Sequence, residues 1–376
     1  MKVLSDPESD DKLEGTNGNS SPTVMVKKPS AKAKPPKIAS TLGLARYLGL
    51  SEWTVSRAIN GHPEVKAATK ERIFKAMDEV GFRPNPVARG LSGKAMGIVG
   101  ICFGNTYNAV MIDKITLLDQ FLRDHQLRGI LAISPKDEAS EVRILEDFRH
   151  LRVDGIVLIQ SFLSADQLHD VLEGVPCVHV DPSDPTLLPS VTLDRAEAMR
   201  LEVDHLVEFG HRSFGALGFS SSNRWRWDGL VKALLDQGIN PDKNLQAFEL
   251  DTPGLESYAE GIELAKLALK AKKRPTAFIA VNDRVAVGAM QEMRDAGFRT
   301  PEDFSVAGFD NFAIGRHLHP TITTIDQQAH LLIQKAGELL LEQLGKTPQS
   351  GKDKALSIEP RLILRESTGP VPRRSR

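Results

Sequence analysis

Residues 41–65 read TLGLARYLGLSEWTVSRAINGHPEV, and two breaks divide this stretch into helix-like runs. Gly49 and Ser51 separate the first run from the second, at the places where a C-cap glycine and an N-cap serine belong. Gly61 and Pro63 then end the second run. Two short helices joined by so tight a turn form a helix-turn-helix.

A third helix is expected from about Thr69 to Val80, because apolar residues recur there at helical spacing. The side chains that the three patterns turn toward a common core are Leu42, Ala45, Leu48, Val55, Ala58, Ile59, Ile73, Ala76, Met77 and Val80. The outer face of the second helix carries hydrogen-bonding and flat groups where solubility alone favours Lys and Glu. These groups are Ser51, Glu52, Trp53, Ser56, Arg57 and Asn60. The face indicates DNA reading, and a three-helix bundle without a partner is the alternative.

Charge is distributed unevenly along the 376 residues, although the formal net charge is only -1. Residues 27–100 hold 14 Lys and Arg against 5 Asp and Glu, so this segment carries +9 and the remainder carries -10. A basic head on an acidic body is typical of a nucleic-acid-binding protein that has a second function. A solvated charged face is the alternative.

Two segments are expected to lack stable structure of their own. Residues 1–36 are poor in apolar residues and change from acidic to basic, so we interpret them as a disordered arm. The segment FRPNPVARGLSGK (82–94) permits a helix of one to two turns over about 86–92. Because so short a helix is unstable alone, we expect coil there unless a partner holds it.

Composition excludes several classes of protein. Two cysteines, Cys102 and Cys177, are too few for a disulfide framework or a four-thiolate zinc site, and we expect neither a metal nor a cofactor. No apolar run approaches the roughly 18 residues that span a bilayer, and no export signal opens the chain. We therefore expect a cytoplasmic protein that contacts no membrane.

From Met96 onward, buried apolar runs alternate with amphipathic segments such as 108–125, 195–209 and 256–271. The runs are GIVGIC (97–102), GILAI (129–133), GIVLI (155–159), PCVHV (176–180), FGALGF (214–219), AFIAV (277–281) and FSVAGF (304–309). This rhythm is typical of parallel strands linked by crossover helices, and it extends over enough chain for two α/β lobes. Ligands in such folds bind at the carboxyl ends of the strands.

Six motifs follow one another in a characteristic order. They are TVSRAING (54–61), RPNPVARGL (83–91), VDGIVLI (153–159), HLVEFGHRSFGALG (205–218), FIAVNDRVAVGA (278–289) and PEDFSVAGFDN (301–311). Together they resemble the lactose-repressor (LacI/GalR) family of bacterial transcription regulators, from about Ile38 to Glu366. The resemblance implies an all-α helix-turn-helix head, a hinge helix, and an α/β two-lobed core like that of periplasmic sugar-binding proteins.

The domain boundaries expected on this basis follow the composition shifts. They are a disordered arm at 1–36, the helix-turn-helix domain at 37–82, a hinge helix and linker at 83–95, an effector-binding and dimerisation core at 96–369, and a tail at 370–376. Within the core, we expect lobe 1 at about 96–194 and 327–352, and lobe 2 at about 195–326 and 353–369.

The resemblance also implies which residues contact DNA. Glu52, Trp53 and Arg57 occupy the base-reading positions, and an arginine can form a bidentate bond to guanine. Glu52 departs from expectation, because a carboxylate helps only by accepting from a cytosine amine or by orienting another donor. Leu91 matches the hinge leucine that wedges into a minor-groove step. Lys66 stands where the family often has a capping serine, so the third helix should start less firmly. The other implied DNA-binding residues are Ser51, Thr54, Ser56, Asn60, Asn85 and Ala88.

In the core, the resemblance implies an effector site made of Tyr107, Asp181, Arg226, Asn282 and Asp310. These groups suit a polyhydroxylated molecule, because carboxylates and an amide bind vicinal hydroxyls, a guanidinium donates, and an aromatic ring covers the apolar face. We interpret Asp283 as a helix N-cap rather than a ligand contact. Trp225 and Trp227 are interpreted as packing residues, with a role in the pocket wall as the alternative.

These inferences predict a homodimeric regulator that binds a pseudo-palindromic operator in double-stranded DNA. We expect it to repress carbohydrate-utilisation genes, with an operator affinity that a small sugar-like effector controls; the sequence leaves open whether this effector is an inducer or a co-repressor. A purine or a phosphorylated metabolite is the alternative effector. A non-regulatory sugar-binding protein and an enzyme are the alternatives from other classes. Catalysis is disfavoured because the common nucleotide and hydrolase motifs are absent, and Cys177 and His179 read as parts of a buried strand. The tail has no heptad that would join dimers into tetramers.

Overall fold

Contacts divide the chain into two units, residues 1–85 and 86–376, each of which is described here by itself. The computed structural model describes residues 38–59, 61–84, 95–104, 109–135, 137–161, 163–182, 188–219, 224–250, 257–348 and 355–372. Within these ranges, every helix falls short of the length and apolar character that crossing a bilayer requires.

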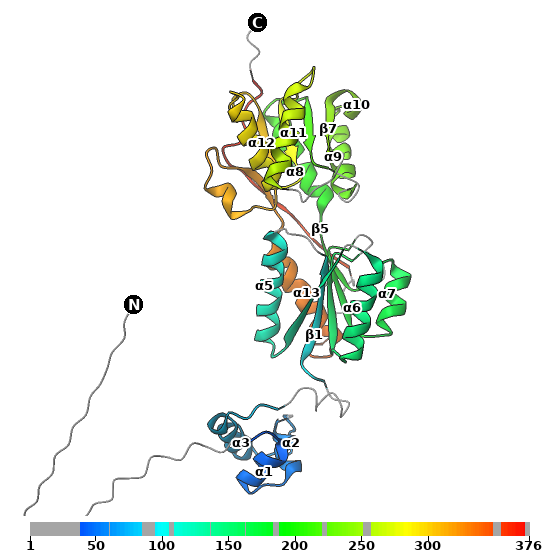
Figure 1. Ribbon diagram of the computed structural model, residues 1–376, viewed down its shortest axis with the longest axis vertical. Coiled ribbons are helices and arrows are strands. Elements are labelled where there is room, and N and C mark those ends of the chain that lie inside the picture. Colours follow the sequence, from blue (N-terminus) through cyan, green and yellow to red (C-terminus); the bar gives the residue numbers. More distant parts are fainter. Residues whose placement is uncertain are drawn as a thin grey trace, which may run out of the picture. The chain divides into compact units, whose positions relative to one another are not determined.

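The first unit holds three helices, as the sequence predicts (Figure 1). They are α1 (Thr41–Leu48), α2 (Glu52–Ile59) and α3 (Ala67–Val80). Gly49 ends α1 with a φ of 65°, a left-handed conformation that glycine adopts without strain. The Ser51 hydroxyl accepts a hydrogen bond from the Thr54 amide at 3.1 Å and so caps α2. Lys66 makes no side-chain bond at the start of α3, so this helix begins without a cap.

The core of the head forms where the pattern predicts it, except at one position. Leu44 is fully buried on α1, whereas Leu42 is 42% exposed. Two residues along a helix turn by about 200°, so Leu42 points away from the face that Leu44 and Leu48 bury. The prediction for Leu42 is therefore wrong.

The second unit contains two six-stranded sheets, one in each lobe (Figure 1). In lobe 1 the order is β11-β5-β4-β3-β1-β2, with every pair parallel. In lobe 2 the order is β12-β10-β9-β8-β6-β7, and only β12 runs antiparallel to its neighbour. The strands of lobe 1 are β1 (Ile98–Gly104), β2 (Arg128–Ser134), β3 (Gly155–Ile159), β4 (Cys177–Val180), β5 (Ser190–Leu193) and β11 (Ala355–Ile358). Those of lobe 2 are β6 (Phe214–Leu217), β7 (Leu245–Phe248), β8 (Ala277–Ala280), β9 (Ser305–Phe309), β10 (Thr323–Asp326) and β12 (Arg361–Ile363).

Helices cover both faces of each sheet, which is why β3, β4, β6, β8 and β9 are buried along their whole length and read as unbroken apolar runs (Figure 1). The helices of lobe 1 are α5 (Ala109–Asp124), α6 (Glu138–His150), α7 (Ala165–Leu172) and α13 (Ala329–Gln343). Those of lobe 2 are α8 (Arg195–Glu208), α9 (Arg224–Asp236), α10 (Pro241–Asn244), α11 (Tyr258–Lys270), α12 (Asp283–Asp295) and the short 3-10 helix η2 (Ala313–Arg316).

The chain crosses between the lobes three times, from β5 to α8, from β10 to α13, and from β11 to β12. The third crossing corrects a predicted boundary. Residues 355–358 were expected in lobe 2, but β11 pairs in parallel with β5 and so covers the edge of the lobe 1 sheet. The Asp194 amide also donates to the Ile358 carbonyl at 2.9 Å, which joins the first crossing to the third.

Candidate functional site

The exposed face of α2 carries the base-reading side chains predicted from the sequence. Trp53 is 62% exposed, and the Arg57 guanidinium stacks on its ring, 4.0 Å from the centroid. Arg57 also forms an ion pair with Glu64. On the opposite face, Val55 and Ala58 are buried and anchor the helix to the head. The stack holds the guanidinium flat against the indole on the outer side of α2.

The other predicted DNA-binding residues of the head support this face. Glu52 is exposed in the first turn of α2, where a carboxylate interacts favourably with the positive end of the helix dipole. The Ser51 and Thr54 hydroxyls are 2.8 Å apart, which braces the start of the helix, and Ser56 is half-buried. The predicted hinge helix lies outside the described residues, as do Asn60, Asn85, Ala88 and Leu91.

Three of the predicted effector residues meet at the carboxyl ends of β8 and β9. Arg226, on α9, donates to the Val281 carbonyl, and its guanidinium lies 4.8 Å from the centre of the Phe309 ring. Asn282 directly follows Val281, and Asp310 directly follows Phe309. The α9 helix therefore folds Arg226 over the same strand ends that carry Asn282 and Asp310. Tyr107 lies outside the described residues.

Asp181, the fourth of the predicted effector residues that the structure describes, follows β4 in lobe 1 and is fully engaged by the protein itself. Its Oδ2 accepts from Lys114 Nζ at 2.6 Å, and its Oδ1 accepts from the Leu193 amide at 3.0 Å and lies 3.2 Å from Arg195 Nη2. Burial alone would raise its pKa. The charges of Arg195 and Lys114 and the hydrogen bonds to the carboxylate instead hold the pKa of Asp181 well below its usual range.

The contacts of Lys114 extend from Asp181 toward lobe 2. Its Nζ also donates to Gln327 Oε1 at 3.1 Å, and Gln327 Nε2 donates to Asp310 Oδ1. We call these four side chains the interlobe series. They connect Asp181, the predicted effector residue after β4 in lobe 1, to Asp310, the predicted effector residue after β9 in lobe 2, although β4 and β9 belong to different sheets.

Sequence reasoning missed Lys114, Gln327 and Arg195. One signal was available for Lys114. It stands on α5 in helical register with Met111 and Leu118, which are buried, so it interrupts an apolar face with a charge. A lysine at such a position requires buried acceptors, and it therefore points to an internal ion pair.

The interpretation of Asp283 as an N-cap is wrong. The cap of α12 is Asn282, whose Oδ1 accepts from the Val285 amide at 2.9 Å. Asp283 is instead fully buried in the first turn and accepts from Thr324 Oγ1 at 2.6 Å and from the Phe312 amide at 2.7 Å. Burial raises the pKa of Asp283 to about 8. Asp283 therefore holds the segment after β9 in place. Asn282 caps the backbone of α12, in addition to its predicted role in the effector site.

Glu202 is a further acidic group in this region that the sequence analysis did not select. It lies on α8, is 1% exposed, and neither of its carboxyl oxygens has a hydrogen-bond partner within the described ranges. Burial raises its pKa well above the usual range, although the nearby charge of Arg226 opposes this shift. The protonated form of Glu202 is therefore favoured more than it is for an exposed carboxyl group.

Comparison with known proteins finds a matching family model in each of the two units. Residues 43–85 match the family described as bacterial regulatory proteins, lacI family, and residues 203–368 match the periplasmic binding protein-like domain. The HTH-type transcriptional regulator MalR of Streptomyces coelicolor is 31% identical over 345 residues, which cover 88% of this chain and 96% of that protein. The chain belongs to the lacI family of bacterial regulatory proteins.

Two further relatives of this lacI-family chain agree with that assignment. Catabolite control protein A of Priestia megaterium is 27% identical over 331 residues, 86% of this chain and 98% of that protein. The crystal structure of the lac repressor dimer bound to operator and the anti-inducer ONPF superposes with a TM-score of 0.76 at 26% identity, over 88% of this chain and all of that chain. The predicted family, the two-part fold and the role as a transcriptional regulator are thereby confirmed.

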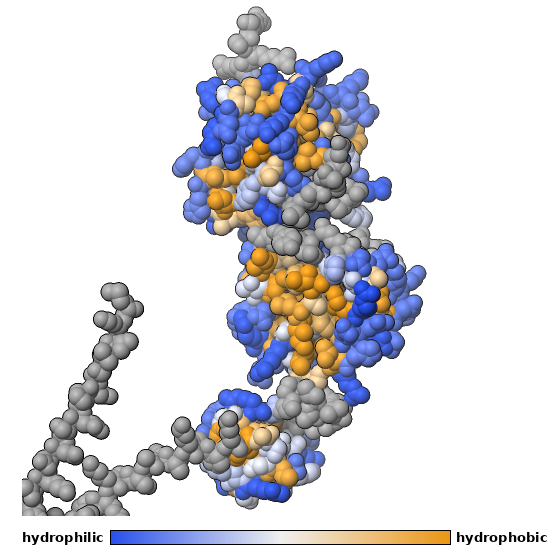
Figure 2. Space-filling model, viewed as in Figure 1, coloured by the Kyte–Doolittle hydropathy of each residue, from blue (hydrophilic) through white to orange (hydrophobic). Residues whose placement is uncertain are grey.

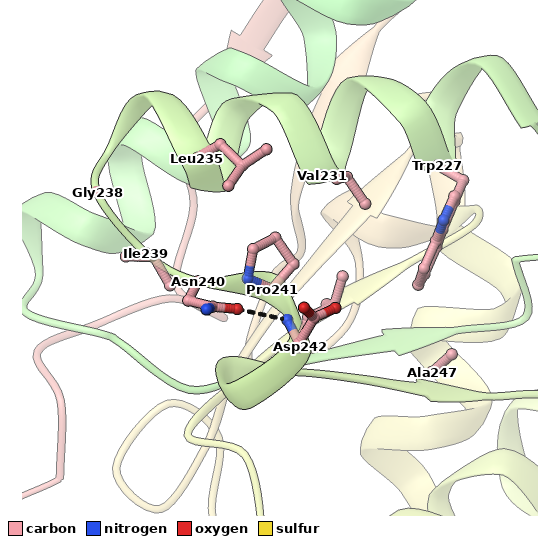
Figure 3. A pocket seen from close by; sticks show the side chains of 10 residues that line it. Trp227, Val231, Leu235, Gly238, Ile239, Asn240, Pro241, Asp242 and Ala247 are labelled. Carbon is pink, nitrogen blue, oxygen red and sulfur yellow. Dashed lines mark hydrogen bonds between the residues drawn. The ribbon is translucent and has the colours of Figure 1, made fainter.

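A groove of about 830 Å³ lies on the lobe 2 surface of this lacI-family chain (Figure 3). It is lined by Trp227, Val231, Leu235, Gly238, Ile239, Asn240, Pro241, Asp242, Leu245 and Ala247, and so by none of the predicted effector residues. Trp227 stands at one end of it and packs edge-to-face on Phe219, 6.2 Å between ring centres, whereas Trp225 is 62% exposed. The groove is therefore separate from the strand ends that carry Asn282 and Asp310.

Lobe 1 exposes apolar side chains on and beside β2, the last strand of its sheet (Figure 2). Leu131 and Ile133 are 52% and 57% exposed on β2, and Ile112 is 65% exposed on α5. We call these three residues together with Ile130 the apolar edge. An edge strand with unpaired backbone groups and exposed apolar side chains favours pairing with another chain.

The described ranges contain no group of three His, Cys, Asp or Glu residues arranged to hold a metal ion. Cys102 and Cys177 are both buried and unpaired by a disulfide. Burial raises the pKa of Cys102 to about 12 and raises that of Cys177 further above its usual value. Both thiols are therefore poor nucleophiles at neutral pH.

Proposed function

We propose that this lacI-family regulator is a homodimeric repressor that binds a pseudo-palindromic operator, and that a small polyhydroxylated effector such as a sugar sets its operator affinity. One observation carries the proposal. A helix-turn-helix head with a polar, aromatic reading face stands on the same chain as a core in which Lys114 and Gln327 link Asp181 of lobe 1 to Asp310 of lobe 2, while Arg226 and Asn282 lie at the adjoining strand ends.

The proposed DNA-binding mode places α2 in the major groove, with Arg57 donating to a guanine and Trp53 stacked beside it. Two heads then read the halves of one operator, and Leu91 of each hinge enters the minor groove between them. The lac repressor dimer, which this chain resembles, was solved bound to operator. Repression follows when the bound dimer blocks transcription of the genes beside its operator.

The proposed effector site takes its chemistry from both lobes. Asp310 and Asn282 offer acceptors, and Arg226 and Lys114 offer donors, so the site suits hydroxyl groups that both donate and accept. A ligand that prefers one arrangement of the lobes shifts the population of that arrangement. The shift then alters the spacing of the hinges and releases the operator.

The apolar edge is proposed to pair with the same edge of a second copy, which gives the dimer a twofold axis through lobe 1. We keep the domain assignment given by the sequence, with 355–358 moved to lobe 1. The proposed role needs no catalytic step, and it places the protein with the chromosome in the cytoplasm.

Selection of DNA from a random-sequence library by the purified full-length chain tests the DNA-binding part. We expect enrichment of a pseudo-palindrome, bound with a dissociation constant of about 10 nM or below at physiological salt. Lengthening the spacer between its halves by half a helical turn serves as the control, because it places the two heads on opposite faces of the duplex. The absence of any enriched sequence would overturn the proposal.

A ligand panel on the selected operator tests the effector part. Neutral sugars, phosphorylated sugars and purines are each added to the complex, and operator affinity is measured. We expect at least one neutral sugar to change affinity by roughly 5- to 150-fold, the usual range for allosteric coupling. A response to purines or to phosphorylated sugars alone would contradict the proposed ligand class and leave the DNA-binding function intact.

A further inference from the structure

Lys114 is a charged side chain placed at the boundary between the two lobes. It projects from α5 and is only 3% exposed. Its Nζ lies 2.6 Å from Asp181 Oδ2 and 3.1 Å from Gln327 Oε1. Burying an ammonium group is costly unless acceptors surround it, so these two bonds explain why the lysine is tolerated there.

Gln327 carries the contact across to lobe 2. It is the first residue after β10, on the second crossing, and its Nε2 donates to Asp310 Oδ1. An amide suits this position because one end accepts and the other donates, whereas a carboxylate or an ammonium could satisfy only one neighbour. The interlobe series therefore alternates acceptors and donors without a break, from the end of β4 in lobe 1 to the end of β9 in lobe 2.

Asp181 does not depend on Lys114 alone. Arg195 Nη2 lies 3.2 Å from its Oδ1, and the Leu193 amide donates to the same oxygen at 3.0 Å. Removal of the lysine therefore leaves this buried carboxylate paired. What the removal abolishes is the connection from lobe 1 to Gln327, so the two contributions of Lys114 can be separated by experiment.

We infer that Lys114 and Gln327 are positioning residues that fix the two lobes of the core in their effector-free arrangement. The inference rests on the proposed function, in which Asp181 and Asp310 face an effector from opposite lobes. A ligand hydroxyl that enters between Lys114 and Asp310 accepts from the first and donates to the second. It thereby replaces the Gln327 amide, frees the second crossing and lets the lobes move.

The test measures the distance between the lobes in the full-length protein without DNA or ligand. Spin labels are attached at exposed positions on α7 and α12, through Asp170→Cys and Gln291→Cys, and the distance distribution is recorded by double electron–electron resonance. The native thiols are buried and have raised pKa values, so they do not take the label. Dilution with unlabelled chain restricts the signal to pairs within one protomer.

The wild-type chain should give one narrow distance peak. Lys114→Met and Gln327→Leu should each broaden it or add a second distance, and the double variant should resemble either single variant because both break one series. Lys335→Met is the matched control, since it removes an exposed ion pair with Glu338 on α13 and should leave the peak unchanged.

Unchanged peaks in both Lys114→Met and Gln327→Leu would overturn the inference. A loss of thermal stability in Lys114→Met with the wild-type distance retained would have the same meaning, because it would reduce the lysine to a local ion pair. Neither result concerns operator binding, so the inference can fail while the proposed function stands. Failure of DNA selection would likewise leave these distances valid.

Discussion

Arg57 is held between two neighbours on the surface of the head. Trp53 orients the guanidinium by stacking, and Glu64 pairs with it from the segment after α2. The Glu64 carboxylate is 64% exposed, so this ion pair is screened by solvent and worth at most about 1 kcal/mol. DNA can therefore displace Glu64 at little cost, whereas the stack on Trp53 keeps the donor fork oriented.

Replacement of Arg57 by lysine should relax recognition at one base pair in each half-site. Lysine keeps the charge but loses the planar fork, so discrimination there should fall by about 1–3 kcal/mol while binding to unrelated DNA stays the same. Competition binding with operators substituted at each position measures this. Arg46→Lys, on the exposed side of α1, is the control and should leave the profile unchanged. A uniform loss over all sequences would show that Arg57 contacts phosphate.

His179 should make the stability of lobe 1 depend on pH. It is 5% exposed on β4, its Nε2 accepts from the Ser161 amide at 3.3 Å, and burial lowers its pKa to about 4. Between pH 6.5 and 4 the unfolded chain binds a proton that the folded chain refuses, so the free energy of unfolding should fall by up to about 3 kcal/mol as the pH drops. His179→Gln retains an acceptor and should remove this part of the fall. Urea unfolding at pH 7 and at pH 4.5 compares the two chains, and parallel losses would contradict the prediction.

Single residues also show where reasoning from the sequence stops. Arg226, Asn282 and Asp310 were predicted because they match effector positions of the family that the sequence resembles, and their contacts place them at neighbouring strand ends. Lys114 and Glu202 carry no motif. Each is an ionisable residue on the buried face of a helix. The partners of Lys114 come from segments distant in the chain, whereas the carboxyl oxygens of Glu202 have no hydrogen-bond partner within the described ranges. Helical periodicity shows that such a position is buried, but not what lies opposite it.

Among the three helices described in the head, α3 alone begins without a side-chain cap. Lys66 occupies its N-cap without a side-chain bond, whereas Ser40 caps α1 and Ser51 caps α2. Lys66→Ser should stabilise α3 by about 1 kcal/mol, because the hydroxyl can accept from an amide of the first turn. Hydrogen exchange of peptides from 67–80, followed by mass spectrometry, should slow about fivefold if opening is local. Lys75→Ser removes the same charge from the middle of α3 and should not slow exchange. Equal exchange in both variants would show that the cap does not limit opening of this helix.

The strands divide by composition into those that the sequence predicted and those that it did not. The seven apolar runs all form strands; six of them are central and buried in a covered sheet, whereas β2 is an edge strand whose apolar side chains are partly exposed. The missed strands, β5, β7, β10, β11 and β12, have three or four residues each and contain polar side chains. All five lie at the sheet margins or beside a crossing, where pairing with a distant segment rather than local pattern decides the structure.

At the scale of the whole molecule, the two units differ in charge and in function, as the uneven charge distribution along the sequence indicated. The basic segment forms the head, and the acidic remainder forms two lobes joined by three crossings. The interlobe series and the bond from Asp194 to Ile358 both act at these crossings. These bonds join the first crossing to the third and the second crossing to α5 of lobe 1, so the three crossings are not independent of the lobes they connect.

The apolar edge should hold the dimer together, and Leu131→Glu tests it. Leu131 is already 52% exposed, so the substitution should spare the fold of the protomer. In a twofold pair, however, it would bring two carboxylates toward each other and remove apolar contact, so light scattering should show monomers at micromolar concentration. Operator affinity should then fall steeply, because a single head contacts only one half-site.

Leu267→Glu, at a 42% exposed position on α11 of lobe 2, is the matched control and should remain dimeric with unchanged operator affinity. A Leu131→Glu chain that stayed dimeric and bound its operator as the wild type does would place the interface elsewhere. A wild-type tetramer would instead contradict the proposed homodimer. Both outcomes are separable in one experiment, because light scattering gives the mass of each variant directly.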